Sequence, residues 1–391
     1  MEPTSHSISL DAARGLAAVL VLIGHVRGIF LVDYGTVVHS SGLLAGVYLL
    51  TSLGHRAVVV FFVLSGYLIG SAVLRSVIDN EWKWAAYLLS RLTRLWVVLL
   101  PALVLAAGWD ALGQQLSAAA FYHHAVAADS VLTFDISQRD SLTTFLGNVV
   151  FLQEILVRPF GSDSALWSLS YEFWYYLAFP LLLLSAVGRA SLGRRIGYAV
   201  LGVGILVFAG FTIAEYFLLW LLGASLAFIV IRRPVLTTQP LAVPILLVSA
   251  AALLFVSFAP PLRTSFGGDV MWAIATFALI AATRCRPGSQ PMPRLYQIVS
   301  IALAGCSYTL YLVHVPVLTF LRAVITPSAR WQPSASSLLA CGAITIAILA
   351  HAYLLALVTE RQTARVRRWL AGALPSRLGL RKPTQQASVT G

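Results

Sequence analysis

The sequence contains few charged residues. Only 11% of its 391 residues are charged, whereas a soluble domain carries about 25%. Hydrophobic residues make up 59% of the chain, so it has too little polar surface to dissolve as a globule. We therefore expect an integral membrane protein. Its organisation is better described by its membrane-spanning segments than by soluble domains.

Cysteines and nucleotide- or metal-binding motifs are also scarce. The three cysteines, Cys285, Cys306 and Cys341, show neither metal-ligand spacing nor a CxxC pair, and two of them lie in apolar runs. Walker, GxSxG, HExxH and Rossmann glycine motifs are missing, and no internal repeat is evident. We expect no metal site. No cleavable signal peptide is expected either, because the first apolar stretch lacks a basic leader and is interrupted by Arg14 and His25.

The formal net charge of +12 would suit a nucleic-acid-binding protein, but the basic residues fall in short clusters between apolar runs. That pattern is typical of cytoplasmic loops in membrane proteins, so we expect no nucleic-acid partner. With a cytoplasmic N-terminus, most lysines and arginines fall in the cytoplasmic loops and the C-terminal tail. We predict that both termini are cytoplasmic and that the protein crosses the cell (inner) membrane several times.

Ten apolar segments predict the architecture, an all-α polytopic bundle of about ten transmembrane helices. The stretch 145–157 is too short to span and is predicted to be re-entrant or interfacial. Residues 1–360 are predicted to form the membrane domain, and 361–391 a basic, disordered cytoplasmic tail. The segments lie near 12–32, 46–74, 96–112, 166–187, 196–213, 216–231, 241–259, 269–283, 297–322 and 336–359.

The longest predicted loop, 113–165, would be extracytoplasmic. It contains the adjacent histidines His123 and His124. The loop could be simply solvated, or it could help to hold an acceptor, because long loops often carry function.

Two ionisable residues interrupt the first apolar segment. Arg14 and His25 are separated by about three helical turns, or roughly 16 Å, and project from nearly the same face. We place Arg14 at the cytoplasmic mouth, where Asp11 can pair with it, and His25 beyond the bilayer midplane. Buried ionisable groups are functional candidates by default. The alternatives are a snorkelling arginine and a histidine that only joins helices by a hydrogen bond.

Glu172, in the fourth segment, is predicted to reach a depth similar to that of His25. The two side chains should then pair, with the carboxylate orienting the imidazole and raising its basicity. A purely structural ion pair is the alternative. Ser65 lies in a Ser-Gly pair that favours close helix packing, and it is also a candidate for substrate contact.

Four further residues complete the candidate site. Arg91 and Arg94 lie one turn apart near the cytoplasmic start of the third helix, a spacing that suits phosphate recognition but also plain positive-inside charge. His314 is predicted near the outer face, where it could line the acceptor side or cap a neighbouring helix. With Tyr311 of the same helix, it is a substrate-binding candidate.

Five stretches in order along residues 8 to about 360 resemble the acyltransferase 3 family of membrane acyltransferases. Together they give a specific signal, although each is weak alone. They are the DxxRG…H pattern of Asp11, Arg14, Gly15 and His25, FFVLSGYLI at 61–69, RLTRL at 91–95, WSLSYEFWYY at 167–176 and SYTLYLVHVPV at 307–317.

This resemblance implies ten core helices and transfer of an acyl group, usually acetyl from cytoplasmic acyl-CoA, to a hydroxyl of a sugar, surface polysaccharide or related acceptor. It implies essential roles for Arg14 and His25, and CoA phosphate binding by Arg91 and Arg94. Glu172 matches the acidic position of the WSLxxE-type motif. The residues after it, Phe173-Trp174-Tyr175, depart from the usual Glu-Gln-Phe-Tyr.

The resulting hypothesis has acyl-CoA bound by Arg14, Arg91 and Arg94, with His25 as general base on the acceptor hydroxyl. A covalent acyl intermediate on His25 stays open. Two other classes are weighed against it. A transporter would also bury ionisable groups at mid-membrane but would not consume acyl-CoA. A non-catalytic assembly protein would not need the buried histidine and glutamate.

Overall fold

The computed structural model describes residues 5–116, 121–122, 131–132, 134–232, 265–284 and 292–373. The predicted segment 241–259 and the pair His123 and His124 lie outside these residues. The α-helices are α1 (Ser5–Phe30), α2 (Gly42–Thr51), α3 (Gly54–Ile78), α4 (Trp84–Leu116), α6 (Leu142–Val149), α7 (Trp167–Val187), α8 (Leu192–Ala209), α9 (Phe211–Arg232), α11 (Phe266–Arg284), α12 (Arg294–Ala304), α13 (Ser307–Ile325), α14 (Ala335–Val358) and α15 (Thr363–Ala373).

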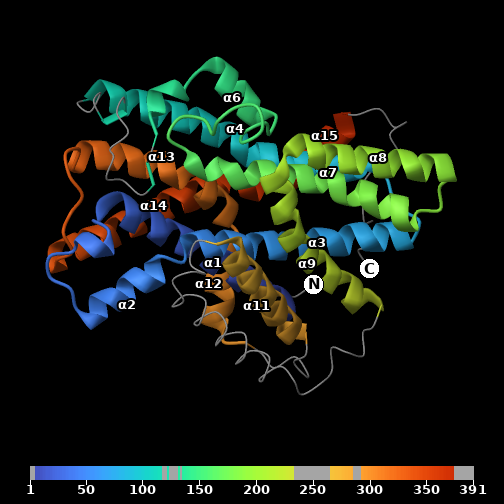
Figure 1. Ribbon diagram of the computed structural model, residues 1–391, viewed down its shortest axis with the longest axis horizontal. Coiled ribbons are helices and arrows are strands. Elements are labelled where there is room, and N and C mark those ends of the chain that lie inside the picture. Colours follow the sequence, from blue (N-terminus) through green and yellow to red (C-terminus); the bar gives the residue numbers. More distant parts are fainter. Residues whose placement is uncertain are drawn as a thin grey trace, which may run out of the picture.

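The predicted all-α membrane bundle is confirmed. Within the described residues, eight helical stretches are long and apolar enough to cross a membrane. The long helices α3, α4, α7, α8 and α13 run along the longest axis of the molecule (Figure 1). Many apolar side chains on the outside of the bundle stay exposed, as expected where lipid rather than water surrounds the helices.

Three predicted segments differ from the observed helices. The segment 46–74 is divided into α2 and α3, and the segment 297–322 is divided into α12 and α13 at Gly305 and Cys306. Apolar composition continues through both breaks, so hydropathy alone did not reveal them. The segment 96–112 is the centre of a longer helix, α4, which begins at Trp84 and continues through Pro101. Arg91 and Arg94 therefore lie about two and nearly three turns inside α4 rather than at its start.

The described part of the predicted C-terminal tail is helical, which corrects the expectation of disorder there. Helix α15 covers Thr363–Ala373, and its Arg367 donates to the Ser90 hydroxyl of α4 at 3.3 Å. Its arginines alternate with apolar residues at helical spacing, a pattern typical of a helix lying on a surface. The rest of the tail, 374–391, lies outside the described residues.

Glycines allow α3 and α9 to cross at very short distance. A Cβ atom on Gly66 would lie 1.9 Å from the Trp220 carbonyl oxygen, and one on Gly223 would lie 2.0 Å from the Val63 carbonyl oxygen. Only glycine permits such an approach, which is a common device in membrane helix pairs. The prediction that the Ser65-Gly66 pair mediates close packing is confirmed, with Gly66 at the contact.

The stretch 145–157 does not cross the bundle. Its helix, α6, has eight residues, and the chain then enters a loop in which Phe151 adopts a φ of +61° and is fully buried. The Phe151 carbonyl accepts hydrogen bonds from Ser170 and Trp174 of α7 at 2.8 and 2.9 Å. Because its backbone groups are satisfied by neighbouring helices, this irregular segment is tolerated inside the bundle.

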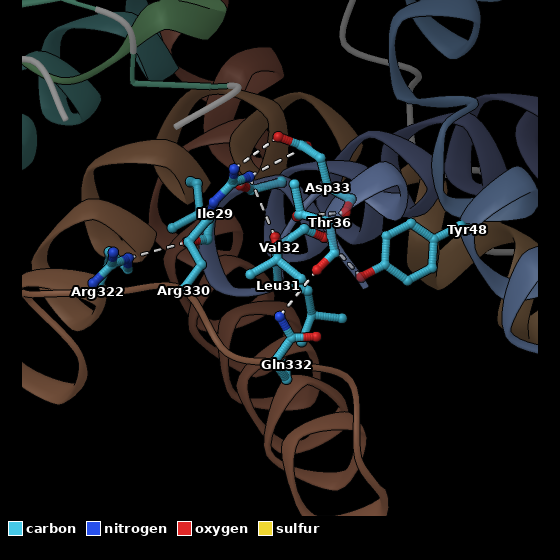
Figure 2. Close-up of polar contacts among 10 residues, drawn as sticks. Ile29, Leu31, Val32, Asp33, Thr36, Tyr48, Arg322, Arg330 and Gln332 are labelled. Atoms are coloured by element: carbon cyan, nitrogen blue, oxygen red, sulfur yellow. Dashed lines mark hydrogen bonds and ion pairs between the residues drawn. The ribbon is translucent and has the colours of Figure 1, made fainter. Parts of the chain in front are cut away.

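The segments that follow α1 and α13 are joined by polar contacts (Figure 2). Arg330 forms an ion pair with Asp33 at 2.7 Å, and buried Arg322 of α13 donates to the Ile29 carbonyl of α1 at 3.1 Å. The Trp331 amide also donates to the Phe30 carbonyl at 2.7 Å. These contacts fix α1 alongside α13, so side chains in the middle of these two helices face each other.

Candidate active site

A cavity of about 330 Å³ lies among α1, α3, α4, α7 and α13. Its polar lining gathers the candidates Arg14, Ser65, Arg91, Arg94, Glu172 and Tyr311 from five helices. The structure therefore brings six of the predicted site residues together around one cavity. Ser168, Tyr176, Ser307 and Tyr308 also line the cavity and were not predicted to do so. The first two lie in the WSLSYEFWYY stretch, at positions facing the same side of α7 as Glu172.

Three arginines give this cavity positive charge. Arg14 pairs with Asp11 at 3.2 Å, as predicted, and donates to the Ala304 carbonyl at the end of α12. Arg91 donates only to the hydroxyl of Ser90, at 3.0 Å, and Arg94 makes no hydrogen bond or ion pair with any described residue. Guanidinium groups without carboxylate partners in a cavity wall are suited to bind phosphate.

Glu172 does not pair with His25. Its Oε1 accepts hydrogen bonds from the hydroxyls of Ser65 at 2.7 Å and Tyr176 at 2.5 Å. The predicted hydrogen bond to His25 is therefore wrong, although both residues lie in the bundle. The carboxylate faces α3 across the cavity, whereas His25 of α1 faces α13.

The partner of His25 is His314. Nδ1 of His25 lies 2.6 Å from Nε2 of His314, and the two rings stack with their centroids 4.9 Å apart. His314 is fully buried, and its Nδ1 lies 3.0 Å from the Leu310 carbonyl oxygen. The contact links α1 and α13, whose far ends are fixed by the contacts around Arg330.

These hydrogen bonds determine the tautomers of a neutral histidine pair. A carbonyl oxygen can only accept, so Nδ1 of His314 carries a proton and its Nε2 carries a lone pair. That lone pair accepts from Nδ1–H of His25, which leaves the lone pair of His25 on Nε2. The arrangement thus presents one unprotonated ring nitrogen, Nε2 of His25, that can act as a base.

His314 was predicted near the outer face from its distance to the start of its helix, and that distance is shorter than expected. The estimate assumed one continuous helix over 297–322, but α13 begins at Ser307, so His314 lies only two turns into the helix. The break after α12 therefore brings His314 level with His25. Two histidines in separate apolar helices were visible in the sequence, but their contact depends on this break.

The histidine pair lies next to the cavity and is not part of its lining. Tyr311 stands between them: it lines the cavity, and its ring centroid is 6.1 Å from that of His314. The Tyr311 hydroxyl shares a 2.7 Å hydrogen bond with Ser168 of α7. His25 itself is partly exposed, unlike His314. Tyr311 thus connects the cavity to His314, and His314 in turn contacts His25.

A second polar cluster, not anticipated from the sequence, lies at the starts of α3, α9 and α11. Asp269 forms a buried ion pair with Arg56 at 2.6 Å and accepts from Tyr216 at 2.7 Å. His55, with a half-exposed side chain, contacts the same carboxylate at 3.2 Å. Because the charges of Arg56 and Asp269 compensate each other, this cluster serves to join helices.

Comparison with protein-family models finds a match to an acyltransferase domain over residues 7–356. Comparison with curated proteins and with solved structures finds no match. The family match spans most of the chain and includes every residue described above around the cavity. The helical bundle and this match together establish that the protein is a multi-pass membrane acyltransferase belonging to the acyltransferase 3 family.

Proposed function

We propose that the protein transfers an acyl group, acetyl by family resemblance, from acyl-CoA to a hydroxyl of a sugar or surface polysaccharide. The observation that carries this proposal is the cavity with three arginines, whose lining includes Tyr311, the neighbour of His314 in the histidine pair. No metal is needed for this transfer. A transporter would also bury ionisable groups, but the tautomers of His25 and His314 specifically favour proton abstraction.

The donor would enter at the end of the bundle that carries Arg14, Arg91 and Arg94. Charge-assisted hydrogen bonds from these guanidinium groups suit the phosphates of CoA. The thin pantetheine arm then extends along the cavity, past Ser65 and Glu172, and brings the thioester towards Tyr311. The positive-inside pattern supports a cytoplasmic location for this arginine-rich end, and the proposed location of the protein is the cell (inner) membrane.

His25 then acts as the general base. Nε2 of His25 takes the proton of the acceptor hydroxyl while the oxygen attacks the thioester carbonyl carbon. A C–O bond forms, the C–S bond breaks, and the CoA thiolate leaves and takes the proton back from His25. His314 holds the ring through Nδ1 throughout, and the closely packed helices limit competing hydrolysis. The acceptor would approach from the opposite side of the membrane.

The proposal is tested in a strain that lacks the protein, complemented with wild type, His25→Ala or His351→Ala. His351 is the control because it is another histidine in a transmembrane helix, α14, and does not line the cavity. Alkali-labile acyl groups on surface glycans, measured by NMR, should return with wild type and His351→Ala only. Equal recovery with His25→Ala would reject the role of His25.

A further inference from the structure

A second cavity, of about 260 Å³, adjoins the first. The two share Ile69, Ala72 and Arg91 in their walls, so Arg91 stands at their border. The second cavity opens around the segment that joins α3 to α4 and around the first turns of α4. It lies at the arginine-rich end of the bundle, where the donor is proposed to enter.

Aromatic rings line this second cavity. The Trp82 ring lies 4.8 Å from that of Tyr87, and both line the cavity. The indole N–H of Trp82 is shielded from solvent and has no acceptor among the described residues. A buried donor without an acceptor is costly, and it indicates a site where a bound molecule supplies the acceptor.

The charge around this cavity is mainly positive. Arg91 and Lys83 line it, and Arg367 of α15 reaches its rim by donating to Ser90 at 3.3 Å. Arg91 also donates to Ser90, so two guanidinium groups share one neutral hydroxyl. Among the lining residues only Glu81 is acidic. Such a rim is suited to phosphate groups, and a carboxylate can accept from an exocyclic amine.

We propose that this second cavity binds the nucleotide end of CoA, an adenosine that carries phosphates on both its 3′ and 5′ sides. The adenine stacks against Trp82 and Tyr87, and the 3′-phosphate lies near Lys83 and Arg367. The 5′-diphosphate lies at Arg91, on the border of the first cavity, where Arg14 and Arg94 also bind it. From there the pantetheine arm passes Arg91 into the first cavity. This inference rests on the proposed use of acyl-CoA and adds the part of the donor that does not react.

The first test measures binding of adenosine 3′,5′-bisphosphate to the purified full-length protein by calorimetry. Base–aromatic stacking contributes about 1–3 kcal/mol, so Trp82→Leu should weaken binding by roughly 5- to 150-fold. Arg367→Ala, on an exposed helix face, should weaken binding and reduce its salt dependence. Trp369→Leu and Arg365→Ala, exposed on the same helix, are the matched controls and should bind as wild type.

The second test compares two donors, acetyl-CoA and acetyl-pantetheine, which lacks the nucleotide. Trp82→Leu should raise the KM for acetyl-CoA by at least about fivefold and leave the KM for acetyl-pantetheine unchanged. An equal change for both donors, or no bisphosphate binding by wild type, would overturn the subsite. If the wild-type protein is inactive with both donors, the proposed function is rejected. Bisphosphate binding that depends on Trp82 would still support the subsite in that case. Failure of the function and failure of the subsite can therefore be told apart.

Discussion

The Nδ1–H group of His25 donates a hydrogen bond to Nε2 of His314, and the two nitrogen atoms lie 2.6 Å apart. This direction follows from the Leu310 carbonyl, which can only accept from His314. His314 is therefore the residue that orients the proposed base, His25. The sequence had led us to expect this role for Glu172. The first predictions separate these two assignments.

Replacing His314 should impair the chemical step. His314→Leu removes the acceptor for His25 Nδ1–H, so the ring can rotate or change tautomer. We expect kcat to fall by about 100-fold, the lower range for general acid–base catalysis, with little change in the KM for acyl-CoA. His314→Gln retains an acceptor oxygen and should recover part of the loss. Steady-state kinetics provide the measurement. An unchanged kcat for His314→Leu would show that His314 has no role in the chemical step.

Glu172→Gln should leave the pH dependence of kcat as in wild type. The amide oxygen can still accept from Ser65 and Tyr176, and neither contact involves His25. The measurement is kcat over the pH range in which histidine titrates. A clear displacement of the pH profile would mean that the carboxylate acts on the base during turnover, against the geometry found here.

Arg94→Ala should weaken donor binding. Hydrogen bonds to charged groups contribute about 1.5–3 kcal/mol, so the KM for acyl-CoA should rise roughly 10- to 100-fold. The matched control is Arg75→Ala, because Arg75 lies in the last turn of α3 outside the cavity lining. Equal KM values for Arg94→Ala and wild type would argue against phosphate binding by this residue.

Gly223→Ala should disrupt the crossing of α3 and α9. The added Cβ would lie 2.0 Å from the Val63 carbonyl oxygen, so the helices must separate. Overpacking costs about 1–3 kcal/mol, which should lower the yield of folded protein and its thermal midpoint. Gly204→Ala in α8, where nothing lies within 4 Å of the added Cβ, is the control and should be neutral. Equal thermal midpoints for the two variants would show that the crossing is looser than described.

Asp163, in the loop before α7, should make stability depend on pH. Burial and the nearby Asp110 raise the pKa of Asp163 well above its usual value, and the Ala165 amide opposes this only in part. The raised pKa means that the folded state prefers the neutral acid. Its stabilising contribution is complete below the unfolded-state pKa, about 3.9, and is lost as pH rises from there through the folded-state pKa.

Asp163→Asn keeps the side chain neutral and should therefore raise the apparent thermal midpoint at neutral pH, with little effect at acid pH. Asp140→Asn, at an exposed position of the same region, serves as the control. Thermal scans at several pH values provide the measurement. If Asp163→Asn lowers the midpoint at neutral pH, the carboxylate is charged and paired in the folded protein.

The sequence predicted the bundle and singled out six of the polar residues that line the cavity, because both depend on composition and on local motifs. Charged residues in apolar helices must face the protein interior, so Arg14 and Glu172 were found by their cost in lipid. Arg94 was found by its spacing from Arg91. The His25–His314 contact could not be predicted, because it depends on a helix break at Gly305 that apolar composition conceals. The pairing of Glu172 with Ser65 likewise depends on helix rotation, which hydropathy does not specify.

The most direct test of the account measures release of free CoA from acetyl-CoA by the purified protein, with membranes of the deletion strain as the source of acceptor. Wild type and His351→Ala should release CoA at equal, acceptor-dependent rates, and His25→Ala should lose at least 100-fold of that rate. CoA release by His25→Ala at the wild-type rate would contradict the assignment of His25 as the base.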